Sequence, residues 1–371
     1  MKTEKILVTR SSMPPFEEYV EEIRGIWEDR WLTNFGKRHQ ELQERLKSFL
    51  GVKELTLFSN GHLALEAAIA SFRLEGEVIT TPYTFASTTH AIVRNGLTPV
   101  FCDIDEMTYC INAKKIEELI TPKTTAIVPV HVYGGICDVD KIQEIAQKHH
   151  LKVIYDGAHA FGVKKNGVGV GCFGDATMFS FHATKVFHTI EGGAVACKNS
   201  DLSDILHEIE NFGFLSGDDA VWAGGNAKLS EFSAAMGLCN LRRIETSILS
   251  RKAVVERYRQ NLKNHAGIIL PAQQQGVETT YSYFPVRFIE DIFGEDRDSV
   301  SERLAEKNIF ARKYFYPLTS AFSCYSGKYS VYDTPIAEKV SNSILCLPLY
   351  EELCLDDVDR ICEIILKNCK D

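Results

Sequence analysis

One lysine in the sequence stands among residues that can tune its chemistry. Lys185 ends the run Phe-Ser-Phe-His-Ala-Thr-Lys at residues 179–185 and shortly precedes a Glu-Gly-Gly turn at residues 191–193. A lysine that follows a buried strand can point into a cleft, where burial lowers the pKa of its amine and frees it to form a Schiff base with a carbonyl. A lone lysine in a loop is more often a solvated surface residue, so this assignment needs further residues.

An aspartate ends another apolar run earlier in the chain. Asp156 follows residues 151–155 and precedes Gly-Ala-His at residues 157–159. Ligands of open α/β sheets bind at the carboxyl ends of the strands. A carboxylate there can keep a pyridine nitrogen protonated, which makes a cofactor ring an electron sink, and His159 can contact the ring or its 3′-oxygen. Taken alone, an aspartate like Asp156 is more often a helix N-cap, and a histidine like His159 more often has a structural role.

A possible phosphate site comes earlier still. Ser-Asn-Gly-His at residues 59–62 follows an apolar strand at residues 55–58 and opens a helix from Leu63. The free N–H groups and the dipole of a helix N-terminus favour an anion, and Ser180 can add a hydroxyl. Phe85, in the Pro-Tyr-Thr-Phe run at residues 82–85, can stack on a flat cofactor, or it can be an ordinary core residue.

These residues require a sheet that gathers strand ends at one edge. Apolar runs alternate with amphipathic stretches from residue 51 to residue 198, which predicts a mostly parallel sheet covered by helices. Two apolar strands bracket Lys185 and depart from this alternation. The expected strands are 77–80, 98–103, 126–131, 152–156, 176–181 and 193–198, and the expected helices are 61–72, 85–95 and 139–149.

The remaining sequence predicts a second, smaller domain. A long helical stretch covers residues 230–255, and we place the domain boundary near Ser247. Beyond it we expect a strand at residues 283–289 and helices at 299–307 and 356–367. The 371 residues, 45% of them hydrophobic, are enough for a large domain at residues 1–247 and an α+β domain at residues 248–371.

Composition excludes several classes of partner. Lys and Arg number 41 against 50 Asp and Glu, a formal charge of −9 that argues against a broad nucleic-acid surface. The 11 cysteines include no CxxC pair, which is typical of reduced thiols and indicates neither a metal site nor a disulfide framework. No window is long and apolar enough for a membrane span, and the first ten residues do not resemble a signal peptide. The sequence therefore predicts a cytoplasmic protein without nucleic-acid or membrane partners.

In this order, the motifs resemble the DegT/DnrJ-type sugar-nucleotide aminotransferases, a fold type I family that depends on pyridoxal 5′-phosphate. The similarity spans nearly the whole chain. It implies an α/β, aspartate-aminotransferase-like fold with a large mixed-sheet domain and a smaller C-terminal α+β domain. The landmarks are residues 31–36 (WLTNFG), 59–62 (SNGH), 82–85 (PYTF), 131–134 (HVYG), 156–159 (DGAH), 180–185 (SFHATK), 225–228 (GNAK) and 345–349 (LCLPL).

The resemblance also implies roles for matching residues. Lys185 would carry the Schiff base and shuttle protons, Asp156 would hold the pyridinium nitrogen, and Phe85 would stack on the ring. His159 would fill the Gln/His position of the family. The phosphate would be held by Gly61 and His62 through their backbone, by Ser180, and by Asn226 and Lys228 of a second subunit, so that a homodimer shares its active sites.

Two positions depart from the family pattern. Gly157 replaces the usual Ala, and His62 replaces the commoner Thr, which removes a possible hydroxyl from the phosphate site. Neither departure removes a side-chain role assigned above, because Gly61 and His62 are expected to act through their backbone.

The family reaction moves an amino group from L-glutamate to a keto sugar on a nucleoside diphosphate. A related dehydratase branch has histidine in place of the lysine, so Lys185 favours transamination. The stretch at residues 180–193 is most similar to enzymes that aminate dTDP-4-keto-6-deoxy-D-glucose at C4, for O-antigen, lipopolysaccharide or capsule synthesis. Candidate sugar-nucleotide contacts, each of which also fits a packing role, are Trp31, Asn34, His182, His188, Tyr314 and Tyr316.

Two alternatives remain open from the sequence. One is amination at C3 of a 3-keto-6-deoxy sugar nucleotide. The other is a catalytically silent protein that senses pyridoxal phosphate or a sugar nucleotide, because a fold does not fix a function. A nicotinamide-dependent enzyme is a poorer candidate, since no GxGxxG follows an N-terminal strand.

Overall fold

A seven-stranded mixed sheet forms the centre of the larger part of the molecule. The computed structural model describes residues 5–214 and 219–367. Strand β10 is antiparallel to both of its neighbours, β2 and β9, and the other pairings are parallel. In spatial order the strands are β2 (Glu54–Phe58), β10 (Gly193–Cys197), β9 (Ala176–Ser180), β6 (Lys152–Asp156), β5 (Thr124–Ile127), β3 (Glu77–Thr80) and β4 (Thr98–Phe101).

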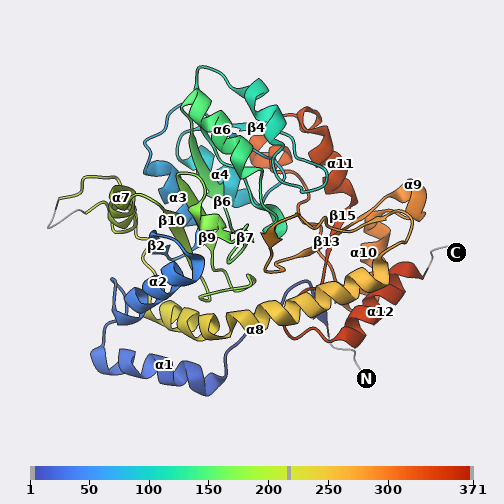
Figure 1. The fold of residues 1–371 in the computed structure, drawn as a ribbon, viewed down its shortest axis with the longest axis horizontal. Helices are drawn as coiled ribbons and strands as arrows, with labels where there is room; N and C mark the ends of the chain where they lie inside the picture. The colour runs from blue at the N-terminus through green and yellow to red at the C-terminus, as the bar shows by residue number, and fades with distance from the viewer. Residues whose placement is uncertain (1–4, 215–218, 368–371) are drawn as a thin grey trace.

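Helices bury both faces of this sheet (Figure 1). Within β6, Ile154 belongs to one buried cluster, whereas Val153 and Tyr155 belong to the other, as the two-residue period of a strand requires. Burial on both faces explains why the strand reads as a continuous apolar run. The covering helices are α3 (Gly61–Ala70), α4 (Ala86–Arg94) and α7 (Ser200–Glu210) on the Ile154 side, and α2 (Lys37–Leu50) and α6 (Val139–His149) on the other.

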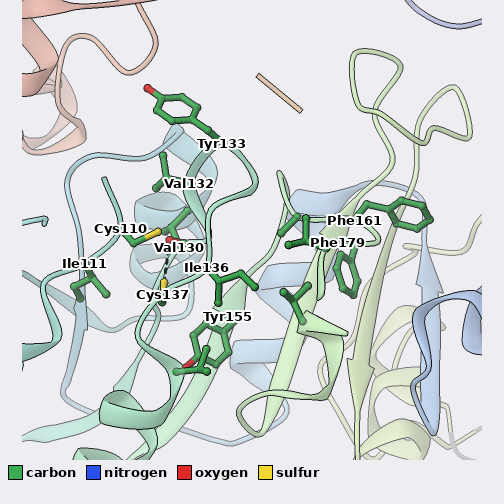
Figure 2. Packing of buried hydrophobic residues seen from close by; sticks show 14 of the residues in the cluster. Cys110, Ile111, Val130, Val132, Tyr133, Ile136, Cys137, Tyr155, Phe161 and Phe179 are labelled. Carbon is green, nitrogen blue, oxygen red and sulfur yellow. Dashed lines mark hydrogen bonds between the residues drawn. The ribbon is translucent and has the colours of Figure 1, made fainter. Parts of the chain in front are cut away.

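The second face carries the larger apolar cluster, part of which Figure 2 shows. Val130 and Val132 continue from the end of β5, and Tyr133 lies farthest along this segment from Tyr155. Cys137 is fixed in the same cluster, since its thiol donates to the carbonyl of Val130 at 3.2 Å. The segment after β5 is therefore held by packing, by a side-chain hydrogen bond and by a parallel bridge between Val130 and Asp156 of β6.

The expected elements are largely confirmed, with differences at strand ends. Strands 77–80 and 152–156 and helix 139–149 have the predicted bounds. The strand expected at 126–131 ends at Ile127, because Pro129 has no N–H for the ladder. The strand expected at 98–103 ends at Phe101, and the Asp103 carboxylate instead accepts the N–H groups of residues 336 and 337. The departure from parallel alternation around Lys185 is confirmed by the antiparallel pair β9 and β10.

The long helix predicted from residue 230 extends farther than expected. Helix α8 (Glu231–Leu262) is continuous through Ser247, so the proposed boundary falls inside a helix (Figure 1). Its last turns, with Tyr258 and Leu262, join a separate apolar cluster in the C-terminal part of the chain. That cluster contains β11 (Ile268–Ile269), β13 (Phe284–Phe288), β15 (Ile344–Leu347), α10 (Arg297–Glu306) and α12 (Leu355–Leu366).

The division into residues 1–247 and 248–371 is only partly reflected in the packing. Strand β1 (Ile6–Leu7) pairs in parallel with β14 (Ile309–Phe310), and Ile6 lies in the C-terminal cluster. Tyr314 and Phe315, in turn, pack into the large-domain cluster. The shorter elements are α1 (Phe16–Asp29), α5 (Ala113–Ile116), α9 (Glu290–Phe293), α11 (Pro335–Ser343), β7 (Lys164–Lys165), β8 (Val168–Gly169) and β12 (Val277–Glu278).

In the part of the chain that the structure describes, no helix is long and apolar enough to cross a membrane. Within the same residues, no group of three or more His, Cys, Asp or Glu side chains is arranged to hold a metal ion.

A buried glutamate closes the N-terminus of α2. The N-cap residue Gly36 has no side chain to cap the helix, and the N–H groups of Arg38 and His39 donate instead to Glu231 at 2.8 and 2.9 Å. The backbone N–H of Glu231 donates to the carbonyl of Leu32 at 3.0 Å. A Cβ at position 36 would lie 2.5 Å from the Glu231 carboxyl carbon, so the close approach requires glycine. Glu231 therefore fixes residues 32–36 against the start of α8.

We predict that Glu231→Ala lowers the free energy of unfolding by about 2–3 kcal/mol, because two charge-assisted hydrogen bonds are lost and two N–H groups at a helix terminus are left without an acceptor. Urea unfolding followed by circular dichroism measures this change. Glu44→Ala, at an exposed position of α2, is the matched control and should change stability by less than about 0.5 kcal/mol. Equal midpoints for the two variants would contradict the capping role.

Candidate active site

The structure brings Lys185 and Asp156 to the same edge of the sheet. Asp156 is the last residue of β6, and Lys185 lies in the connection between β9 and β10. Strands β6 and β9 are parallel neighbours, so their carboxyl ends meet at one edge. The Lys185 ammonium lies 5.8 Å from the ring centroid of Tyr283, and its charge acts on the Asp156 carboxylate.

The Asp156 carboxylate is buried and held by two donors. Asp156 lies on the same face of the sheet as Ile154, which is the face that α4 covers. The hydroxyl of Thr88, in α4, donates to Oδ2 at 2.7 Å. The N–H of Ala158 donates to Oδ1 at 3.0 Å. Burial raises the pKa of Asp156 above its ordinary value, while these two hydrogen bonds and the charge of Lys185 act to lower it. The site thus holds a desolvated carboxylate that a cationic ring nitrogen would stabilise.

His159 is buried beside this carboxylate as a neutral ring. The backbone N–H of Tyr133 donates to Nδ1 at 3.2 Å, so Nδ1 accepts and Nε2 carries the proton. Burial, followed by the charges of Lys185 and Arg312, lowers the pKa of His159 well below its ordinary value. The ring is nearly parallel to those of Tyr133 and Phe315, with interplanar angles of 8° and 3° and centroid distances of 6.2 and 5.7 Å. His159 therefore presents a fixed N–H donor.

The expected phosphate site consists of Gly61, Ser180 and the start of α3. The Asn60 side chain accepts the N–H of Leu63 at 2.9 Å and caps the helix, whose first N–H groups have no acceptor within the helix. A Cβ at Gly61 would lie 2.7 Å from the Cβ of Ser180, so only a bare backbone fits there. The His62 side chain turns to Glu66 at 3.3 Å, which leaves its backbone for the role proposed from the sequence.

Phe85 offers an open aromatic face. It is the N-cap residue of α4 and is 48% exposed, although its ring centroid lies 6.3 Å from that of the buried Tyr314. An exposed phenyl ring at the edge of a polar site is the arrangement that a stacked cofactor ring would cover.

No described contact places Asn226 or Lys228 next to Lys185 of the same chain. Asn226 is exposed, and the Lys228 ammonium lies 4.5 Å from the ring centroid of Phe212. Burial lowers the pKa of Lys228, while the neighbouring Glu210 acts to raise it. Between them, the carbonyl of Ala227 accepts the N–H of Ser59 at 2.6 Å. Their action in a second subunit therefore stays a prediction.

The six candidate sugar contacts differ widely in their surroundings. Trp31 and Tyr316 are 55% and 49% exposed, and Asn34 accepts the Trp31 indole N–H through its carbonyl. His182 is partly exposed near Glu191 at 3.6 Å. Tyr314, in contrast, is buried in the aromatic wall beside His159.

His188 is the candidate least accessible to a ligand. It is 1% exposed, and its Nε2 lies 2.6 Å from the carbonyl of Ser12. The Asn240 amide donates to the His188 backbone carbonyl at 2.9 Å. These contacts describe a packing role, which the sequence left open, and a sugar contact by His188 would require Ser12 to move.

Three residues of the site were missed from the sequence. Thr88 lies one turn after Phe85 in α4, and Tyr283 lies at the start of a segment that was predicted only as a strand. Tyr83 binds the Tyr133 hydroxyl at 2.6 Å, and this hydroxyl also donates to the carbonyl of Tyr314. The position of Tyr83 and Tyr133 in two of the motifs was the available signal, whereas nothing in the local sequence marked Tyr283.

These features fit pyridoxal phosphate at this edge of the sheet. The buried carboxylate matches a protonated ring nitrogen, the bare backbone of Gly61 and the helix start match a phosphate, and the open ring of Phe85 matches a flat aromatic group.

Comparisons with known proteins agree with this geometry. Residues 16–366 match the model of the DegT/DnrJ/EryC1/StrS aminotransferase family. The chain is 43% identical to a dTDP-4-amino-4,6-dideoxy-D-glucose transaminase of Shigella dysenteriae, with 97% of this chain and 98% of the relative covered. A transaminase of the same name from Escherichia coli is also 43% identical, with 99% of each chain covered.

The solved structures show the same relationship. The crystal structure of DesI in the presence of its TDP-sugar product has a TM-score of 0.93 and 32% identity, and covers 97% of this chain and 92% of that one. The fold is therefore that of a pyridoxal-phosphate-dependent aminotransferase, and the roles of Lys185, Asp156 and the phosphate site stay predictions. The chain belongs to the DegT/DnrJ/EryC1/StrS aminotransferase family.

Proposed function

We propose that this aminotransferase moves the amino group of L-glutamate to C4 of dTDP-4-keto-6-deoxy-D-glucose. The observation that carries the proposal is that the charge of Lys185 acts on a buried Asp156 in a chain that is 43% identical, over 97% of its length, to a dTDP-4-amino-4,6-dideoxy-D-glucose transaminase. Use of the product in O-antigen, lipopolysaccharide or capsule synthesis, and a cytoplasmic location, belong to the same proposal.

The chemistry divides between the cofactor and the chain. Bound pyridoxal phosphate supplies the electron sink that stabilises negative charge at the reacting carbon. Asp156 keeps the proton on the ring nitrogen, and the donors from Thr88 and Ala158 hold its carboxylate in place. Lys185 Nζ would move a proton from the α-carbon of glutamate to a carbon of the cofactor in one half-reaction, and from that cofactor carbon to C4 of the sugar in the other.

The surrounding residues control orientation and water. The neutral His159 offers its Nε2–H as a donor, and its position is fixed by the Tyr133 backbone N–H. Tyr83, Tyr133, Tyr283, Tyr314 and Phe315 form an aromatic wall that limits the access of water to Lys185. A dry site strengthens the interaction of Asp156 with a cationic ring nitrogen.

A homodimer is part of the proposal. Phe212, Phe214 and Val221 are exposed apolar residues in the segment that also carries Asn226 and Lys228. Trp27, Trp31 and Leu32 are exposed as well. Because these apolar groups are exposed, we expect another protein surface to cover them. A second copy of the chain would do so and would bring its Asn226 and Lys228 to the phosphate site of its partner.

The absorbance spectrum of the purified holoenzyme tests the reaction. The wild type should show a visible cofactor band that L-glutamate removes, and dTDP-4-keto-6-deoxy-D-glucose should restore it with an amino group at C4 of the product, which NMR can locate. Lys185→Ala should slow the glutamate half-reaction by about 10²–10⁴-fold, because a positioned acid-base group is lost. Lys148→Ala, an exposed lysine, is the control. Amination at C3 would favour the alternative substrate, and a wild type without a glutamate response would favour the silent binder.

Asp156→Asn separates the electrostatic role of the carboxylate from its shape. We expect the turnover number to fall by about 10²–10³-fold, since a stabilising charge beside the reacting group is removed. Because burial raises the pKa of Asp156 in the fold, ionisation of this carboxyl destabilises the apoprotein as the pH rises through and above about 4. The apoprotein of the variant should therefore be at least as stable as the wild type at neutral pH. A large loss of apoprotein stability in the variant would show that the residue is mainly structural.

Mixed dimers test the shared active site. Lys185→Ala and an Asn226→Ala/Lys228→Ala variant should each be nearly inactive, because each removes one half of every site. Unfolding and refolding the two together should restore activity to about a quarter of the wild-type value, since half of the dimers formed at random contain one intact site. Activity that stays at the level of the separate variants would mean that the two groups of residues serve the same subunit.

A further inference from the structure

One cavity of the described chain has no wall formed by Lys185 or Asp156. Its volume is about 510 Å³, and it lies between the segments around Thr108 and Gly134 of the large domain, one face of α8, and residues 271–285. Tyr283 forms part of its wall, and the ring of this residue also lies 5.8 Å from the Lys185 ammonium. The cavity is therefore next to the catalytic centre, separated from it by one aromatic side chain, and its volume is in the range of small-molecule sites.

One side of the cavity is cationic. Lys252 and Arg259 line it from α8, and because they are seven residues apart they lie on the same face of the helix. One terminal nitrogen of Arg259 donates to the carbonyl of Pro271 at 2.6 Å, but its Nε is buried without a hydrogen-bond partner in the described chain. Lys252 has a single exposed partner, Glu256, at 3.8 Å.

Burial makes the charge of Arg259 energetically costly. Desolvation lowers the pKa of Arg259, and the nearby Tyr281 hydroxyl only partly opposes this effect. A guanidinium with a free Nε presents planar donors of the kind that bind phosphate or carboxylate oxygens. Among the lining residues, Glu278 is the only acid, and it is exposed. The cavity thus favours an anion.

The other sides of the cavity are aromatic or bare backbone. Tyr109, Tyr133, Tyr281 and Tyr283 line it, and Figure 2 shows the Tyr133 ring extending away from the buried cluster around Val130. Gly134 and Gly135 add a stretch of wall without side chains.

A glutamine amide gives the cavity a fixed rim. The side-chain carbonyl of Gln274 accepts the N–H of Ile136 at 2.8 Å, and its amide donates to the Ile136 carbonyl at 2.7 Å. These two bonds hold residues 271–275 beside the large domain. The shape of the cavity is consequently set before any ligand binds, which reduces the ordering that binding requires.

We propose that this cavity binds a nucleoside diphosphate. Arg259 and Lys252 hold the phosphates, and the tyrosine wall stacks on the base. Two cations on one side and flat aromatic rings on the other match a ligand that is anionic at one end and aromatic at the other. Neither a purely apolar ligand nor a small cation would satisfy the Arg259 Nε.

This nucleotide has two possible sources. It can be the nucleotide portion of the sugar substrate, in which case the inference rests on the proposed function. It can also be a separate nucleotide, free or sugar-bound. Such a nucleotide would contact Tyr283 from the cavity and so change the environment of Lys185. Both sources require the same phosphate contacts, so one set of variants distinguishes them.

The test measures dTDP binding to the holoenzyme by isothermal titration calorimetry. Lys252→Gln/Arg259→Gln should weaken binding by about tenfold or more, because two charge-assisted contacts to phosphate are lost. Ala272→Trp, at an exposed lining position, fills the cavity without removing a charge and should weaken binding similarly. Lys37→Gln/Lys148→Gln, with two exposed lysines, is the matched control and should bind as the wild type does.

Kinetics of the same variants identify the source of the nucleotide. If the KM for the dTDP-sugar rises while kcat and the glutamate half-reaction are unchanged, the cavity holds the nucleotide of the substrate. If KM is unchanged but inhibition by dTDP at saturating substrate disappears, the cavity holds a separate nucleotide. Unchanged dTDP binding in both cavity variants would overturn the proposal, and an intact glutamate half-reaction would then show that only the cavity assignment, not the transaminase function, had failed.

Discussion

The site depends on keeping one desolvated carboxylate ionised at the end of a buried strand. Asp156 occupies this position because β6 is apolar on both faces, so its last residue emerges at a dry edge of the sheet. Thr88 and Ala158 supply the hydrogen bonds that make burial tolerable. The charge of Lys185 adds to this compensation, and a protonated ring nitrogen of the bound cofactor would complete it. This arrangement depends on the parallel pairing of β6 and β9, on the position of α4 and on the aromatic wall.

The sequence predicted best what depends on neighbours in the chain. Strand 152–156 and helix 139–149 were predicted with their observed bounds, since burial on both faces and a clear helical period are local signals. Strand 126–131 was predicted too long, because Pro129 interrupts the regular ladder, after which a single bridge between Val130 and Asp156 follows. Contacts between distant segments leave no local pattern in the sequence, so only the three-dimensional structure reveals them. Examples are the contacts of Glu231 with the N-terminus of α2 and of Tyr283 with Lys185.

Burial distinguishes candidate site residues that their residue types alone could not distinguish. His188 and Tyr316 were equivalent candidates in the sequence, yet one is enclosed by Ser12 and Asn240 and the other is half-exposed. Lys185, Asp156, Gly61 and Ser180 were recognisable because their order along the chain matches a known set of motifs. Asn226 and Lys228 lie outside what a single chain can test, since their proposed partners belong to a second copy.

The pairing of β1 with β14 has a consequence for how the chain is made. Ile6 leaves the ribosome about three hundred residues before its partner Ile309. Until then the strand has no ladder to join, and the C-terminal cluster that buries Ile6 does not exist. The sheet around Asp156 uses only residues 54–197 and can form earlier. During synthesis, the sheet edge that carries Asp156 can therefore form before β1 has a partner, and the segment around Ile6 must stay unpaired until β14 is made.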